Sequence, residues 1–588
     1  MLRPLRVAVL LALALPAIPA FAAASDLTTE SERSGFVRTG RYEEVIALCD
    51  RFAKAYPKAV RCVEFGTTPE GRPMKALIAS TRGAFTPDQA RRQNLPVVLI
   101  QGGIHAGEIV GKDAGFLALR EVLEGKAATG SLDKLVWVFV PVFNIDGHER
   151  FGAWNRPNQR GPEEMGWRVT AQNYNLNRDY VKADAPEMQA MLRLVQQWDP
   201  LAYVDLHATD GAQFEHDISV QVEPVHAGDE GLRTAGRALR DGVLADLARQ
   251  GSLPLPYYPS FVVGDDPSSG FEDSVAPPRF SHGYFQLRNR IGMLVETHSW
   301  KEYPVRVKIT RNTIVATLDQ IAAHGADWLK AAQQADVAAA KLAGQPVPLE
   351  WAASEKSHTV EFRGYEYTRT PSDVSGALMT RYDENKPQIW KVPMRDELHP
   401  SLSVPAPGAG YLVPAAYAGW VGEKLKQHGI EFRRVPALAG EKVEAFRATR
   451  TRFGAQPVET HQRLTVEGAW APEARDVPAG SLFVPIAQPK SRLLMALLEP
   501  QGPDSLAAWG EFNSAFERKE YMEDYVAEDV ARKMLQDPVV KAAFEQKLKD
   551  DPEFAKNAGA RLEFFYRRHP AWDERFNLYP VYRTSRVP

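Results

Sequence analysis

The sequence predicts an α/β protein whose first domain folds around a mostly parallel or mixed sheet. Between residues 41 and 300, apolar runs typical of buried strands alternate with segments that space apolar residues as helices do. The chain has 588 residues, and 44% of them are hydrophobic. A chain of this length is too long for a single hydrophobic core, so we expect two or more domains. Polar residues follow the ends of three apolar runs, where α/β sheets gather their ligands.

The first elements are expected to be a helix and a hairpin. Residues 41–56 carry apolar side chains at helical spacing, and Pro57 ends that pattern. Residues 60–66 and 74–80 read as strands joined by the turn EGRP, so we expect them to pair with each other.

The chain has two cysteines, Cys49 in the predicted helix and Cys62 in the first predicted strand. In an oxidising compartment they could form one disulfide joining the helix to the strand, and two buried thiols are the alternative. Their spacing does not indicate a metal site.

The rest of the first domain continues the alternation. A buried strand at residues 95–103 ends in glycines and precedes a helix at 113–124 and a buried strand at 134–144. A further helix and two further strands are expected at residues 185–198, 201–207 and 291–298. Such alternation predicts helices on both faces of the sheet.

The chain is expected to divide into three parts. Residues 1–24 read as a signal peptide, 25–345 as the first α/β domain and 346–588 as a C-terminal α/β accessory domain with a helical tail. A long helix over about residues 310–342 closes the first domain, and residues 344–350, GQPVPLE, read as a linker. The accessory domain is expected to contain an exposed strand and a strand–helix–strand unit.

The first residues combine a basic start, a short apolar run and a small-residue cleavage site. A membrane anchor is the alternative, but the run falls short of the roughly 20 residues that a spanning helix needs. We therefore expect a periplasmic or secreted protein with no membrane association after cleavage.

The formal net charge is −3, and basic and acidic residues are interspersed along the chain. Because there is no basic tail or stripe, nucleic acid is not expected as a partner.

The segment GGIHAGE places His105 and Glu108 three residues apart, directly after a buried strand. If Glu108 starts the next helix, both side chains can reach one ion, and zinc suits nitrogen and carboxylate ligands. His207 also ends a buried strand and is the best candidate for a third ligand. These residues predict a catalytic zinc site that keeps a position for water.

Glu296 ends the apolar run IGMLV in a strand that should be nearly buried. Burying a carboxylate without partners is costly, so a salt-bridged structural glutamate is the alternative reading. In the functional reading, Glu296 takes a proton from the attacking water and passes it to the leaving nitrogen.

Arg168 in GWR and the adjacent pair Asn177 and Arg178 in NLNRDY complete the candidate site. A guanidinium can bind a substrate carboxylate bidentately or stabilise an oxyanion that develops on the scissile carbonyl. A given arginine is more often a surface charge, and only the neighbouring motifs single these two out.

Taken together, these segments resemble the zinc carboxypeptidases of the carboxypeptidase A type. The matching pieces cover about residues 40–300 and are, in order, YPKAVRCVEFGTTPEGRPMKALIAS, GGIHAGE, PVFNIDGHE, GWR, NLNRDY, VDLHATDG and LVETH. Their order, spacing and context agree, although no single piece is specific.

The resemblance implies a mixed eight-stranded sheet sandwiched by helices, one Zn²⁺ ion, and a peptide substrate with a free C-terminus. It also implies a role for each candidate: His105, Glu108 and His207 as zinc ligands, Glu296 as general base and acid, Arg168 polarising the scissile carbonyl, and Asn177 with Arg178 holding the terminal carboxylate.

The sequence departs from the family pattern at two places. Asn175 stands where the family has an acidic partner of the first zinc histidine; it can still accept a hydrogen bond from the imidazole, without the charge. Ser274 stands where the family has a substrate-contacting tyrosine, and we expect Tyr284 to substitute for it.

Three other functions use the same fold. An amidase acting on cell-wall peptides would cleave muropeptides, and an N-acyl amino acid deacylase or esterase would reject substrates longer than an acyl amino acid. A non-catalytic binding protein would be expected to lack zinc ligands or the catalytic glutamate, and all of these residues are present.

Overall fold

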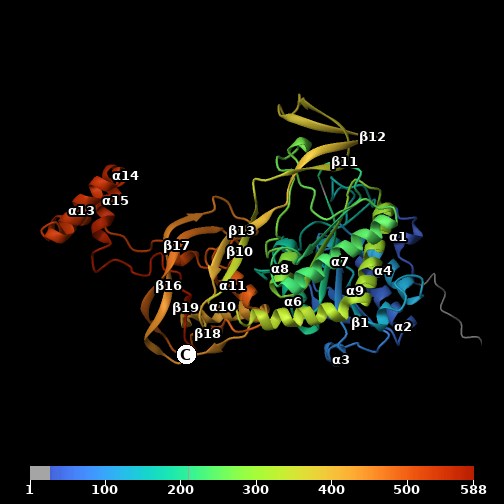
Figure 1. Cartoon of the computed structure of the whole chain (residues 1–588), viewed down its shortest axis with the longest axis horizontal. Coiled ribbons are helices and arrows are strands. Elements are labelled where there is room, and N and C mark those ends of the chain that lie inside the picture. The colour runs from blue at the N-terminus through green and yellow to red at the C-terminus, as the bar shows by residue number, and fades with distance from the viewer. Residues whose placement is uncertain (1–26, 210) are drawn as a thin grey trace, which may run out of the picture.

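The computed structural model describes residues 27–209 and 211–588, so the predicted signal peptide lies outside the described residues. An eight-stranded sheet in the order β1-β2-β4-β3-β5-β9-β6-β7 organises the first domain (Figure 1). Its strands are β1 Val60–Thr67, β2 Pro73–Ala79, β3 Val97–Gly102, β4 Val136–Val140, β5 Ala202–Ala208, β6 Ile218–Glu223, β7 Pro254–Leu255 and β9 Ile291–Thr297.

The sheet is mixed, as the resemblance implies. Strands β4, β3, β5 and β9 are mutually parallel neighbours in its centre. The hairpin of β1 and β2 joins one side antiparallel to β4, and β6 runs antiparallel to β9 on the other. The four central strands are buried along their whole length, which agrees with their continuous apolar sequences.

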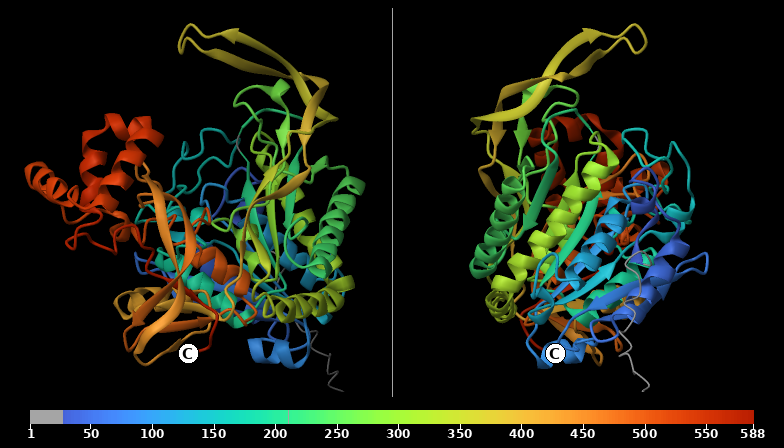
Figure 2. Two further views of the ribbon diagram at one scale, coloured as in Figure 1. Left: turned by 60° about the vertical axis from the view of Figure 1, so that its left-hand side comes forward. Right: turned by 90° about the vertical axis from the view of Figure 1, so that its right-hand side faces the viewer.

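Helices cover both faces of this sheet (Figures 1 and 2). On β5, Leu206 packs against Gly111 of α4, whereas Tyr203 stacks on Phe285 of α8, so α4 and α8 lie on opposite faces. Helix α9 packs against both α4 and α7. The helices of this domain are α1 Glu30–Arg33, α2 Tyr42–Ala55, α3 Pro87–Arg92, α4 Val110–Leu123, α5 Ile145–Glu149, α6 Pro186–Trp198, α7 Glu230–Arg249, α8 Ser281–Leu287 and α9 Tyr303–Ala339.

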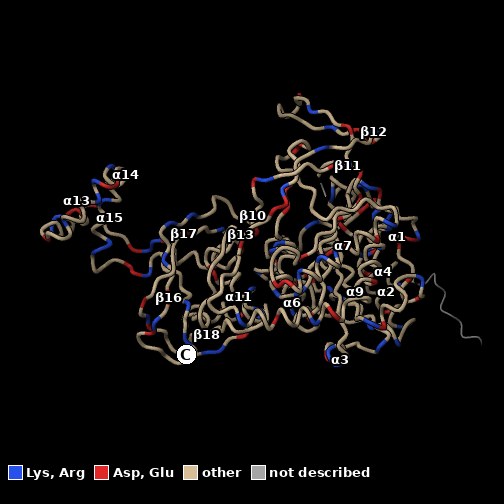
Figure 3. Tube along the Cα trace, in the orientation of Figure 1, with Lys and Arg blue, Asp and Glu red and all other residues tan. Residues whose placement is uncertain are grey.

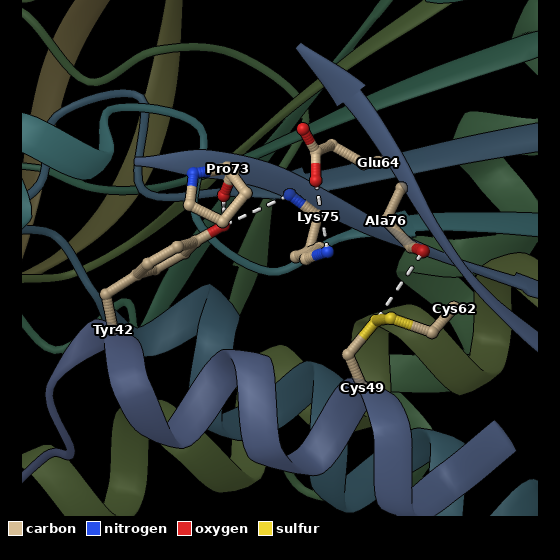
Figure 4. The surroundings of a disulfide bond; sticks show 7 residues. All are labelled: Tyr42, Cys49, Cys62, Glu64, Pro73, Lys75 and Ala76. Carbon is tan, nitrogen blue, oxygen red and sulfur yellow. Dashed lines mark hydrogen bonds and ion pairs between the residues drawn. A yellow bond between two sulfur atoms is a disulfide. The ribbon is translucent and has the colours of Figure 1, made fainter. Parts of the chain in front are cut away.

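A disulfide joins Cys49 of α2 to Cys62 of β1, which is the first of the two alternatives that the sequence left open (Figure 4). Close by, the Tyr42 hydroxyl donates to the Pro73 carbonyl at 2.7 Å and accepts from the Lys75 backbone N–H at 3.0 Å. The disulfide and these hydrogen bonds fasten α2 to the edge hairpin of the sheet.

The predicted linker is wrong, because most of it belongs to a strand. Strand β10 (Pro346–Ala353) pairs antiparallel with β13 (Leu398–Pro405) in a two-stranded sheet. Val347 is buried in the core while Pro346 is exposed. Proline is tolerated in edge strands, so the two prolines of this segment signal an edge strand as readily as a linker.

Two further sheets form the rest of the C-terminal part. A long hairpin of β11 and β12 projects from the molecule, and the end of β12 pairs with β8 of the first domain (Figure 2). The other sheet has six strands in the order β15-β18-β14-β19-β16-β17. The bounds are β8 Phe271–Glu272, β11 His358–Pro371, β12 Leu378–Arg395, β14 Gly410–Val413, β15 Arg433–Arg434, β16 Leu438–Phe453, β17 Leu464–Val477, β18 Leu482–Pro485 and β19 Tyr582–Thr584.

One hydrophobic core extends across both parts of the chain. Val347, Tyr411 and Trp509 belong to the same cluster of buried side chains as the first domain's sheet. The division at residue 345 therefore stays a prediction. The helices of the C-terminal part are α10 Ala415–Gln427, α11 Ser491–Leu498, α12 Asp524–Met534, α13 Pro538–Asp550, α14 Pro552–Lys556 and α15 Ala558–Tyr566.

The last four helices form the predicted helical tail, which stands apart from the main body in Figure 1. Phe544, Phe554 and Phe564 lie in a small core of their own. Acidic and basic residues are interspersed over the whole trace in Figure 3, as the balanced composition predicts. Within the described ranges, none of the helices combines the length and apolar character that crossing a membrane requires.

Candidate metal centre

The three predicted strand ends meet at one edge of the sheet. Strands β3, β5 and β9 are parallel neighbours, so their carboxyl ends lie together. His105 follows β3, and His207 and Glu296 are register partners near the ends of β5 and β9. The alignment of buried parallel strands thus brings residues from three distant segments to one place.

Both histidines direct the same ring nitrogen at Glu108. The Nδ1 atom of His105 lies 3.0 Å from Glu108 Oε1, and the Nδ1 atom of His207 lies 3.0 Å from Glu108 Oε2. The Ala208 backbone N–H also donates to Oε2 at 3.0 Å. One potential ligand atom of each of the three side chains lies within 4.8 Å of the other two, close enough to hold one ion.

The loop between β3 and α4 sets this arrangement. Gly103 has a φ of +65°, a left-handed conformation that turns the chain away from the strand. Glu108 precedes α4, which starts at Val110, so it lies in the loop rather than in the first helical turn that the sequence suggested. A Cβ atom on Gly107 would lie 2.5 Å from Arg156 Cγ and 2.9 Å from the Gly166 carbonyl oxygen, so the loop packs closely on its neighbours.

The outer nitrogen of each imidazole also has a partner. His105 Nε2 lies 3.2 Å from Asn175 Oδ1, which confirms the predicted hydrogen bond, and His207 Nε2 lies 2.9 Å from Asp205 Oδ1. Gln101 donates to the same Asp205 oxygen at 2.7 Å. Because an oxygen atom lies close to each Nε2, both Nδ1 atoms are left to face the centre, so the donor set fits a zinc ion.

Charge around the triad favours the ligating forms of two of its members. Burial lowers the pKa of His105 to about 4, which leaves its imidazole neutral at neutral pH. Burial raises the pKa of Glu108, but Arg156 and His105 outweigh it and hold that pKa well below its ordinary value. Burial lowers the pKa of His207, yet Asp205 and Glu296 raise it well above normal, so metal binding would displace a proton there.

A cavity of about 480 Å³ opens on the triad. The predicted residues Glu296, Arg168, Asn177 and Arg178 all line it. The structure therefore brings every predicted site residue except Tyr284 into one cavity. Its wall also contains His282 and two side chains to which the sequence assigned no role, Arg156 and Tyr258.

Of these cavity residues, Arg156 makes a direct contact with the metal triad. Its Nη2 atom lies 3.0 Å from Glu108 Oε1, and its side chain is buried. It comes from an irregular loop whose sequence carries no periodic signal, so no pattern could have found it. Asp205 could have been found, because it lies two residues before His207 and so shares its face of the strand.

The prediction that Tyr284 contacts the substrate is wrong. The Tyr284 side chain is fully buried and does not line the cavity. Its hydroxyl lies 2.9 Å from His428 Nδ1, so it packs in the interface with the C-terminal part. Helix α8 turns this side chain toward His428 instead of toward Glu296, which proximity in sequence cannot reveal. Tyr258 is the tyrosine in the cavity wall.

The fold and the donor set together define an α/β protein with a group of side chains that fits a zinc ion, beside a buried carboxylate. Residues 45–241 match the family model described as zinc carboxypeptidase. The chain therefore carries a zinc carboxypeptidase domain.

Curated relatives share parts of this chain. It is similar to carboxypeptidase B of Helicoverpa zea, with 29% identity over 26% of this chain and 38% of the relative. It is 34% identical to the inactive metallocarboxypeptidase ecm14 of Schizosaccharomyces pombe over 16% of this chain and 20% of the relative. In both cases the chain spans well under half of the relative's length. Carboxypeptidase 2 of Trichophyton tonsurans is 23% identical over 75% of this chain and 78% of its own.

Solved structures of carboxypeptidases also align with part of the chain. Carboxypeptidase A from Helicoverpa armigera aligns with a TM-score of 0.34 and 17% identity, over 51% of this chain and 74% of that one. The metallo-carboxypeptidase from Burkholderia cenocepacia aligns with a TM-score of 0.35 and 16% identity, over 47% and 68%.

Proposed function

We propose that the protein is a zinc metallocarboxypeptidase that releases residues from the free C-terminus of peptides. The observation that carries this proposal is the Arg178 guanidinium, which lines the same cavity as the metal triad. It forms no ion pair with another described residue, and its guanidinium carbon lies 4.4 Å from the centroid of the Phe280 ring. Burial and the neighbouring Arg168 lower the pKa of Arg178 below its ordinary value, and the opposing charge of Glu459 does not offset them.

A substrate carboxylate is the anion that suits this position. The planar guanidinium can bind it through two parallel hydrogen bonds, and the adjacent Asn177 lines the cavity beside it. A peptide anchored there by its terminus presents its last peptide bond toward the triad. In that pose Arg168, whose Nη1 atom lies 3.6 Å from Glu108 Oε1, can stabilise negative charge on the scissile carbonyl oxygen.

His105, Glu108 and His207 would hold the zinc ion, which when bound supplies a Lewis acid and lowers the pKa of a coordinated water toward neutrality. Glu296 is placed to accept a proton from the attacking water, because it lies beside His207 on the next strand and lines the cavity. It then delivers that proton to the leaving nitrogen as the peptide bond breaks. The proton balance closes without another acid or base.

Export remains part of the proposal. The Cys49–Cys62 disulfide is a bond that persists in oxidising compartments, which supports the predicted periplasmic or secreted location.

The test is to replace Arg178 and compare two forms of one peptide. Arg178→Ala should raise KM for a peptide with a free C-terminal carboxylate roughly 10- to 100-fold, the range expected from losing a hydrogen-bonded charge pair. The same peptide with an amidated C-terminus should be a poor substrate for both proteins. Steady-state kinetics on the two peptides measures both effects.

Arg193→Ala is the matched control, because Arg193 is exposed on α6 and does not line the cavity. It should leave KM unchanged. Equal hydrolysis of the free and amidated peptides by the wild-type protein would contradict carboxypeptidase action. Activity confined to acyl amino acids, or to muropeptides, would favour the deacylase or the cell-wall amidase instead.

A further inference from the structure

A loop of the C-terminal part reaches the metal centre. Strands β16 and β17 form a hairpin, and residues 454–463 connect them. From this loop, Glu459 accepts a hydrogen bond from Asn175 Nδ2 through its Oε1 atom, at 3.4 Å. Asn175 in turn contacts His105, so a carboxylate 284 residues beyond Asn175 in the chain lies one side chain behind a metal ligand.

The orientation of the Asn175 amide follows from its other partners. If His105 binds the ion through Nδ1, its Nε2 must carry the hydrogen and donate it, so the amide oxygen has to face the ring. The Asn177 backbone N–H donates to the same oxygen at 3.2 Å and holds it there. The amide N–H₂ group therefore points away from the metal centre, where Glu459 is its acceptor.

These hydrogen bonds link the negative charge of Glu459 to the His105 imidazole, which has no carboxylate directly beside its Nε2 atom. A carboxylate bonded directly to a metal-bound histidine raises the basicity of the imidazole, and Asn175 cannot do so alone. Hydrogen bonds in series polarise one another, so Glu459 makes the amide oxygen of Asn175 a stronger acceptor for His105.

The turn that presents Glu459 has an unfavourable backbone. Glu459 and Thr460 are its two central residues, with φ of 48° and 70°, and Val458 and His461 exchange backbone hydrogen bonds at 2.8 and 3.0 Å. Two residues in succession at positive φ are usually Asn-Gly, and a β-branched threonine there is an outlier. Such strain persists where the surrounding structure holds it, often at functional sites.

Contacts that follow the turn in the chain hold the loop in place, one of them with the first domain. His461 Nε2 lies 2.7 Å from Asp184 Oδ2, and Lys424 Nζ lies 2.8 Å from the other oxygen of Asp184. Arg463 stacks over Trp509, with its guanidinium carbon 3.9 Å from the ring centroid. The loop is therefore docked at its base, and Glu459 is held at a fixed place beside Asn175.

We propose that Glu459 is a positioning residue of the metal centre, acting through Asn175 on the imidazole of His105. The inference rests on the proposed zinc site but not on the proposed substrate. It assigns the C-terminal hairpin a part in metal binding, with the negative charge behind the ligating histidine supplied by a distant segment of the chain.

The test measures the dissociation constant for zinc of the full-length protein by competition with a chromogenic chelator. Glu459→Gln keeps the size of the side chain and removes its charge, and it should weaken zinc binding about 10-fold, the lower end of the range for partners of ligating histidines. Glu467→Gln is the matched control, because Glu467 is an exposed residue of β17 that pairs with Arg450, and it should leave the constant unchanged.

A second substitution separates the proposed role from a structural one. In the Glu459→Gln background, Asn175→Asp should restore zinc affinity, because it puts a carboxylate directly beside His105 Nε2 and leaves the new amide at position 459 to donate to it. In the wild-type background the same Asn175→Asp change should not improve affinity, because it places two carboxylates next to each other. The sign of the Asn175→Asp effect therefore depends on the residue at position 459.

Equal zinc affinity of Glu459→Gln and the wild-type protein would overturn the inference, and so would a loss that Asn175→Asp does not reverse. Thermal unfolding of each variant in excess chelator verifies that the comparison is between folded proteins. If zinc binds as described but no peptide is cleaved, the proposed function fails while the inference stands. If the wild-type protein binds no zinc, both fail.

Discussion

At the scale of single residues, Glu108 connects the parts of the site. Its two carboxylate oxygens contact both imidazoles, and Arg156 approaches one of them at 3.0 Å. Glu296 is different in kind, because it lines the cavity without belonging to the metal cluster. Mutation can therefore separate the proposed metal ligand from the proposed proton carrier.

Glu296→Gln should lower kcat by about 10²- to 10⁴-fold, the range for loss of a general base, while the zinc content stays at one ion per chain. The amide keeps the shape of the side chain but cannot accept the proton. Metal analysis of the purified variant together with steady-state rates measures both quantities. Glu272→Gln, an exposed change on β8, is the control and should keep full activity. A Glu296→Gln variant with substantial turnover would rule out the proposed proton transfer.

The site residues at strand ends could be predicted because ionisable side chains are unusual directly after buried, apolar strands. His105, His207 and Glu296 each follow an apolar run, and the structure places all three together. The prediction for Tyr284 is wrong because it relied on closeness in sequence to Glu296. Helix α8 directs the Tyr284 side chain into the core instead. Sequence separation reports proximity along the chain, whereas the direction of a side chain depends on packing.

At the scale of elements, the loop between β3 and α4 is packed so closely that it leaves no space for a side chain at Gly107. Gly107 is enclosed by the stem of Arg156 and by the Gly166 carbonyl oxygen, which belongs to the backbone and cannot rotate away. The loop therefore keeps Glu108 and Arg156 in contact through close packing.

Gly107→Ala should reduce the free energy of unfolding by about 1–3 kcal/mol, as overpacking does, and should weaken zinc binding by displacing Arg156 from Glu108. Urea denaturation and chelator competition measure the two effects. Gly419→Ala is the control: Gly419 lies in α10 with open space around its Cβ position, so the change should be neutral or stabilising. A Gly107→Ala protein as stable as the wild type would show that the loop is looser than its packing implies.

Several elements of the first domain were predictable because their signals are local. Continuous apolar runs marked β3, β4, β5 and β9, and helical spacing marked α2 and α6. The linker prediction failed because two prolines mark an edge strand and a linker alike, and only the pairing of β10 with β13 distinguishes them.

At the scale of the whole molecule, the C-terminal part is built onto the first domain. The two share a core, β12 pairs with β8, and Arg160 lies 2.5 Å from Glu384 of the long hairpin. Contacts of this range, including the approach of Glu459 to Asn175, have no signature in a single sequence. These contacts form between segments that are far apart in the sequence and meet only in the folded protein.

We propose above that this molecule is a zinc-dependent carboxypeptidase, and mass spectrometry of a timed peptide digest tests this proposal most directly. The zinc-loaded protein should shorten an unblocked peptide one residue at a time from its C-terminus. Chelator-treated protein should leave the peptide intact, and zinc should restore the activity. Internal cleavage products, or cleavage that survives removal of the metal, would contradict the account.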